Sequence, residues 1–143
     1  AHDWQRAAAN HLIDAGAEAS IISPRGLPEL YKEPSPWLNN ELQTPWEKHH
    51  LRLARDKGVL AMWMAEQVYE TPGRAYAQTS RIELGRIAGW LDYNSPNIKL
   101  VFGISPEYIG GNQTYMEQVC NEFNIPVQRR LDEWCAEILR KLG

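Results

Sequence analysis

Two short runs of consecutive apolar residues limit the fold more than any other feature of this chain. Residues 59–64 read Val-Leu-Ala-Met-Trp-Met, and residues 99–103 read Lys-Leu-Val-Phe-Gly. A strand that is apolar at successive positions is buried on both faces, as in a parallel sheet covered by helices. Both runs are far shorter than the roughly 18 apolar residues that a membrane-spanning helix needs. We therefore expect a parallel sheet between helices, and no membrane partner.

Helix signals alternate with these runs. The pattern predicts helices over residues 3–15, 44–55, 80–91, 113–123 and 131–142, and further short strands over 19–23 and 126–128. Asp3 is placed to cap the first helix and Gly16 to end it. The alternation is typical of the α/β class, and the length of 143 residues predicts a single domain over 1–143.

Two of the predicted helices begin with a capping-box pattern. Thr44 and Glu47 form the first, with Pro45 at the first helical position. Ser80 and Glu83 form the second. In a doubly wound sheet the first helix follows a strand, whereas no strand signal precedes the helix at 3–15. We therefore expect the opening strand to be missing from this chain.

Charge and cysteine content exclude several classes of function. The net charge is −3 and the longest basic block is Arg129-Arg130, so binding to a nucleic-acid polymer is disfavoured. Cys120 and Cys135 form neither a disulfide framework nor a zinc pattern, which favours a reducing, cytoplasmic setting. His49 and His50 point about 100° apart on a helix, and we expect no metal and no cofactor.

Ligands of open α/β sheets bind beyond the carboxyl ends of the strands. The loops after residues 23, 64 and 103 are therefore the candidate site, and Glu83 is its most notable residue. One interpretation makes Glu83 part of the capping box with Ser80. The other notes that Glu83 shares a helix face with Ile87 and Trp90, so that its carboxylate leans toward the sheet and could attack an electrophilic carbon.

Several segments together resemble the nucleoside 2-deoxyribosyltransferase-like superfamily, which includes a nucleotide N-glycosidase branch. They are residues 77–85 (Ala-Gln-Thr-Ser-Arg-Ile-Glu-Leu-Gly) after the strand ending at 64, Pro-Arg-Gly at 24–26, Trp46, and residues 101–108 with Asn112. The resemblance covers most of the chain. It implies a flavodoxin-like (Rossmann-like) three-layer sandwich with a mostly parallel sheet, and a glutamate nucleophile that is Glu83 here.

The chemistry implied by the resemblance is attack of Glu83 on C1′ of a ribose or deoxyribose, with departure of the base. The partner would be a small-molecule nucleoside or nucleotide, and a neighbouring subunit would complete the site, so we expect a homo-oligomer. The substrate-binding candidates are Pro24, Arg25, Trp63, Thr79, Ser80, Tyr108 and Asn112. Arg25 could equally form a structural ion pair, and Trp63 could be a core residue rather than a stacking surface for the base.

One departure from the family leaves the function open. The deoxyribosyltransferases carry an aspartate six residues before the nucleophile, where this chain has Ala77. Thr79 and Ser80 are closer to the glutamate, and small hydroxyl residues at a helix start can receive a phosphate. The alternative to an enzyme is therefore a nucleotide-binding module that senses or sequesters its ligand without turnover.

Overall fold

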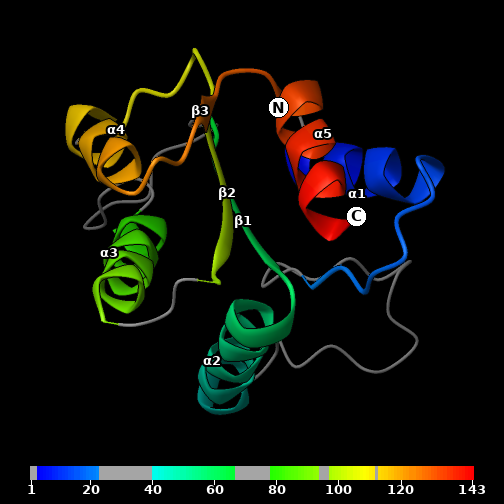
Figure 1. The fold of residues 1–143 in the computed structure, drawn as a ribbon, viewed down its shortest axis with the longest axis horizontal. Coiled ribbons are helices and arrows are strands. Elements are labelled where there is room, and N and C mark those ends of the chain that lie inside the picture. Colours follow the sequence, from blue (N-terminus) through cyan, green and yellow to red (C-terminus); the bar gives the residue numbers. More distant parts are fainter. Residues whose placement is uncertain (1–2, 23–39, 67–77, 94–96, 112) are drawn as a thin grey trace.

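The computed structural model describes residues 3–22, 40–66, 78–93, 97–111 and 113–143, with the backbone only for residues 40–44, 78 and 79. Within these ranges helices and strands alternate from α2 onward (Figure 1). The elements are α1 (Trp4–Asp14), α2 (Asn40–Lys57), β1 (Val59–Met64), α3 (Gln78–Asp92), β2 (Lys99–Ile104), α4 (Gln113–Glu122), β3 (Val127–Gln128) and α5 (Leu131–Leu142). The predicted α/β class is confirmed.

The three strands form one parallel sheet in the order β1-β2-β3. Val59 lies opposite Lys99 and Met64 opposite Ile104, while Phe102 lies opposite Val127. The helices α3 and α4 connect successive strands, as parallel pairing requires. Both apolar runs are thus strands of a parallel sheet, as predicted. The sheet and its helices are compatible with a Rossmann-like fold.

One face of the sheet packs against α2, α3 and α4. Figure 1 shows α3 and α4 on this side of the strands. The buried residues of the cluster are Leu60, Met62, Met64, Leu84, Ile87, Leu100, Phe102, Ile104, Tyr108, Met116 and Cys120. Leu51 and Ala54 of α2 and Trp90 of α3 pack against it. This face therefore packs α2 and the two helices that connect the strands onto one apolar layer.

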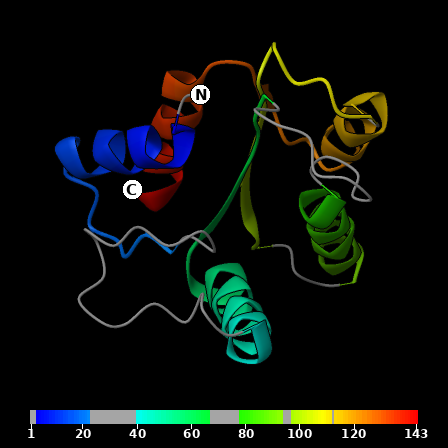
Figure 2. The same ribbon diagram turned by 180° about the vertical axis from the view of Figure 1, so that it is seen from behind.

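The other face packs against α1 and α5, which Figure 2 shows side by side. Three tryptophans dominate it: the Trp134 ring meets those of Trp4 and Trp63 edge to face, each at a centroid distance of 5.9 Å. The Trp134 indole N–H also donates to the Met62 carbonyl oxygen at 2.9 Å. Helices thus cover both faces of the sheet, and the arrangement has three layers.

The predicted strand at 19–23 is wrong over its described part, because residues 19–22 form no strand. The chain here is held by other means. Gly16, with φ of 79°, ends α1 as predicted, and the Ala17 N–H donates to the Leu12 carbonyl oxygen at 3.0 Å. Ile21 packs against the cluster of α1 and α5. A β-branched residue can bury its side chain by such packing without joining a sheet.

Both predicted capping boxes are wrong, although the predicted cap of α1 is confirmed, since an Asp3 carboxylate oxygen accepts from the Arg6 N–H at 3.2 Å. The helix α2 begins at Asn40 and contains Pro45, whose fixed φ is helical and whose missing N–H removes one bond near the helix start. The helix α3 begins at Gln78, so Ser80 is its third residue. A capping residue must have non-helical dihedrals, which Ser80 lacks.

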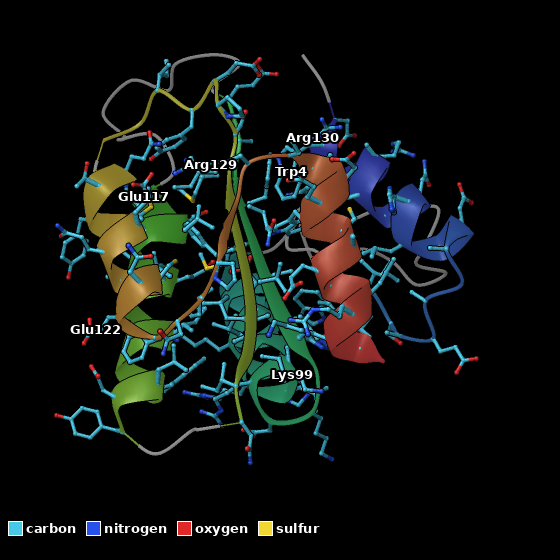
Figure 3. The ribbon with its side chains drawn as sticks, turned by 45° about the horizontal axis from the view of Figure 1, so that its top comes forward. Trp4, Lys99, Glu117, Glu122, Arg129 and Arg130 are labelled. Carbon is cyan, nitrogen blue, oxygen red and sulfur yellow. The ribbon has the colours of Figure 1, made fainter. Side chains whose placement is uncertain are left out.

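An ion pair ties α4 to the end of β3. Figure 3 shows Arg129, just beyond β3, beside Glu117 of α4, and the two side chains form a salt bridge. The Gln113 side-chain amide also donates to a Glu117 carboxylate oxygen, at 3.2 Å. These contacts fix the start of α4 relative to the sheet edge. None of the described helices is both long and apolar enough to cross a bilayer.

Candidate functional site

The loops that follow β1 and β2 begin side by side. Met64 and Ile104, the last residues of the two strands, are paired in the ladder. Beyond them, the Ser105 N–H donates to the Met64 carbonyl oxygen at 2.9 Å, which extends the pairing by one residue. Ser105 is the only buried polar residue in the described part of the chain. The carboxyl edge of the sheet, where open α/β folds bind ligands, is therefore well ordered at this point.

The loop after β2 closes tightly on itself around Tyr108. The Glu107 N–H donates to the Ser105 hydroxyl oxygen at 3.2 Å, and the Tyr108 hydroxyl donates to the Gly111 carbonyl oxygen at 3.1 Å. A Cβ at Gly110 would lie 2.7 Å from Cε2 of Tyr108, so only glycine fits beneath the ring. Burial raises the pKa of Tyr108, and the charge of Arg81 opposes that rise. Because its hydroxyl proton is used within the loop, Tyr108 shapes the edge of the site.

Arg81, which the sequence analysis did not single out, links α3 to this loop. A Cβ built on Gly111 would lie 3.7 Å from Arg81 Nη1, so the guanidinium reaches the loop after β2. The N-terminal end of α3 is thus the end that faces the site. The sequence signal for Arg81 is its place at the predicted start of a helix that follows a strand, where a cation can face the ligand.

Glu83 occupies the second turn of α3, on the face of the helix that packs on the sheet. It precedes Ile87 and Trp90 by four and seven residues, and both of these belong to the apolar cluster. Glu83 itself is half-buried. Burial raises its pKa, the charge of Glu47 raises it further, and the charge of Arg86 lowers it. The half-burial of Glu83 fits the predicted lean of its carboxylate toward the sheet, which stays a prediction, whereas its predicted capping role with Ser80 is wrong because Ser80 lies within the helix.

Glu47 of α2 is a second carboxylate that sequence analysis assigned only to a helix cap. It precedes Leu51 and Ala54 by four and seven residues, and both pack against the same cluster as Ile87. It is also half-buried. The α2 and α3 helices contact each other further along, where the Arg55 guanidinium lies 4.8 Å from the centroid of the Trp90 ring. The heptad-like spacing from 47 to 54 is the sequence signal that could have revealed this orientation.

An aromatic pair lies next to Glu47. The Trp46 ring packs on the His50 ring at a centroid distance of 4.4 Å and a tilt of 53°. Burial, and then the neighbouring His49, lower the pKa of His50. Its Nδ1 is buried and makes no hydrogen bond within the described structure. Trp46 therefore covers an imidazole that favours its neutral form.

The structure does not bring all the predicted residues together. Trp63 lies in the tryptophan cluster of α1 and α5, across the sheet from Glu83, which favours its interpretation as a core residue. Ser80 and Tyr108 lie on the Glu83 side. Pro24, Arg25 and Asn112 lie outside the described residues, as does the side chain of Thr79.

Two further observations bear on the function: the placement of possible metal ligands, and the comparison of this chain with known proteins. Over the described ranges, no group of three or more histidine, cysteine, aspartate and glutamate side chains is placed to hold a metal ion. Comparisons of the chain with protein-family models, with curated proteins and with solved structures found no match.

Proposed function

We propose that this protein cleaves or transfers the N-glycosidic bond of a nucleoside or nucleotide, on a flavodoxin-like fold, with Glu83 as the nucleophile. The observation that carries the proposal is the position of Glu83. It continues an apolar stripe into the side of α3 that faces the sheet, partly out of water, rather than closing a helix cap. The resemblance of residues 77–85 to the nucleoside 2-deoxyribosyltransferase-like superfamily supports the same role.

The chemistry suits a partly desolvated carboxylate. Loss of the base leaves positive charge on C1′ and the ring oxygen of the sugar, in an oxocarbenium-like transition state. A carboxylate with little surrounding water attracts that charge more strongly than an exposed one, because the effective dielectric constant is lower. Glu83 would then form a bond to C1′, and a second base or water would displace it.

The test is release of free base by the purified protein. Nucleosides, deoxynucleosides, their monophosphates and a pyridine dinucleotide are incubated separately, and free base is measured by chromatography. Glu83→Ala and Glu83→Gln are expected to abolish release. The matched control is Glu122→Gln, which removes an exposed carboxylate at the last residue of α4, away from the loops after β1 and β2, and should retain full turnover. Full turnover by the folded Glu83 variants would rule out the proposed mechanism.

The second candidate is a module that binds a nucleotide without turnover. Ala77, at the position where the deoxyribosyltransferases carry a sugar-holding aspartate, favours it. The same panel distinguishes the candidates when thermal unfolding is measured alongside base release. The module would be supported by a ligand that raises the unfolding temperature of the protein and still keeps its base after hours of incubation.

A further inference from the structure

Two carboxylates hold equivalent positions on neighbouring helices. Glu47 begins the stripe that continues through Leu51 and Ala54 of α2, and Glu83 begins the stripe that continues through Ile87 and Trp90 of α3. Both stripes pack on the same apolar cluster. Each glutamate lies one turn before the first apolar residue of its stripe, on the N-terminal side. The two side chains therefore extend the apolar layer at its end with acidic groups.

The helices α2 and α3 contact each other where the Arg55 guanidinium lies over the Trp90 ring. Glu47 lies eight residues before Arg55, and Glu83 lies seven residues before Trp90. These separations correspond to rises of about 12 Å and about 10.5 Å, so the two glutamates lie at similar distances along their helices from this contact. The like charge of Glu47 adds to burial in raising the pKa of Glu83, which is consistent with two carboxylates that lie near each other.

We propose that Glu47 is the acid/base partner of Glu83 and delivers a proton to the departing base. The inference rests on the proposed function, since it assigns a role in the same reaction. Glycosyl transfer with a carboxylate nucleophile needs two groups of this kind, one to attack carbon and one to protonate the leaving group. Glu83 and Glu47 are both half-buried, and each begins a helix stripe that packs on this apolar layer.

The proposed reaction has two steps, transfer of the sugar to Glu83 and its release by water. A Glu83 carboxylate oxygen forms a bond to C1′ while the C1′–N bond breaks, and the electron pair of that bond goes to the base nitrogen. The Glu47 carboxyl proton goes to the base, which leaves neutral. Water then attacks C1′ and gives a proton to the Glu47 carboxylate, and the Glu83–C1′ bond breaks with its electron pair returning to Glu83. With substrate bound, the growing positive charge on the sugar stabilises the ionised form of Glu83, which suits Glu83 to attack carbon and leaves the transfer of a proton to the base to Glu47.

The experiment compares leaving groups. Substrates share one sugar and carry a series of bases, ending with an N7-methylated purine, whose positive charge makes protonation unnecessary. For Glu47→Gln, kcat/KM should fall about 10²- to 10⁴-fold with ordinary bases, as expected for loss of a general acid, and stay close to wild type with the methylated purine. Glu83→Gln should lose activity on every substrate. Glu47→Asp, which retains a carboxyl group, should be intermediate.

Three results would count against the inference. If Glu47→Gln lowers turnover of all substrates equally, or lowers none, while Glu83→Gln is inactive, then Glu47 is not the acid and the proposed function still stands. If the methylated purine rescues Glu83→Gln instead, the two roles are reversed. If wild-type protein releases no base from any substrate, the proposed function fails together with the inference. Thermal unfolding of each variant separates these outcomes from loss of the fold.

Discussion

Gly103 is the residue whose substitution tests the packing of the sheet most directly. It lies opposite Trp63 in the β1–β2 ladder, on the face covered by α5. A Cβ at this position would lie 2.5 Å from Cζ3 of Trp63 and 2.9 Å from Cδ1 of Trp134. Both distances are well below van der Waals contact. Gly103→Ala must therefore displace two indole rings, one of which is almost fully buried.

The expected cost follows from these contacts. Overpacking of a core by one methyl group costs about 1–3 kcal/mol. Displacement of Trp134 also weakens its hydrogen bond to the Met62 carbonyl oxygen, which contributes about 1 kcal/mol. The lower entropy of unfolded alanine offsets about 0.5–1 kcal/mol. We expect a net loss of about 1–3 kcal/mol in the free energy of unfolding.

The assay is urea unfolding followed by tryptophan fluorescence, with Gly89→Ala as the matched control. A Cβ at Gly89, within α3, meets nothing within 4 Å. Because alanine is the better helix former, this control should gain up to about 1 kcal/mol. If Gly103→Ala unfolds at the wild-type urea concentration while Gly89→Ala gains stability, the close packing of the two tryptophans on β2 is refuted.

Three further predictions concern ionisable and polar groups. Folded Glu83 has a pKa above its ordinary value of 4.5, so the folded protein binds that proton more tightly than the unfolded chain does, and stability falls as the pH rises through this range. Glu83→Gln should flatten this fall in pH-dependent unfolding and be more stable than wild type at neutral pH; an unchanged profile would contradict the burial of Glu83. Burial raises the pKa of Cys120 and Cys135 to about 11, so at pH 8 a thiol reagent should label them only after unfolding, and rapid native labelling would refute their burial. Tyr108→Phe removes the hydroxyl that bonds Gly111 and should cost about 0.5–1.5 kcal/mol in urea unfolding, whereas wild-type stability would show that this bond contributes nothing.

Local patterns in the sequence predicted the two longer strands of the sheet. The runs at 59–64 and 99–103 are apolar at consecutive positions, as expected of strands that lie between two layers of helices. Both are strands of the parallel sheet. The cap at Asp3 depends on one hydrogen bond between residues three positions apart, so the local sequence is enough to predict it. The segment at 19–22 has similar residues but packs against helices instead, because nothing in a short β-branched run specifies a partner strand.

Helix starts and the second carboxylate needed tertiary information. Thr44, Pro45 and Glu47 form an ideal local cap, yet α2 extends back to Asn40 and turns Glu47 toward the apolar cluster. Ser80 and Glu83 behave in the same way in α3. Capping contributes about 1 kcal/mol, which packing of a whole helix face readily exceeds.

By itself, the sequence determined the class of the fold and the side of α3 on which Glu83 lies, because periodicity fixes which residues share a face. Only the tertiary structure decided that the charge of Glu47 acts on the pKa of Glu83 and that the ring of Trp63 packs against that of Trp134. Residues on separate helices and strands come together through the packing of whole elements. The spacing of residues along the chain does not predict how far apart such residues lie in the folded protein.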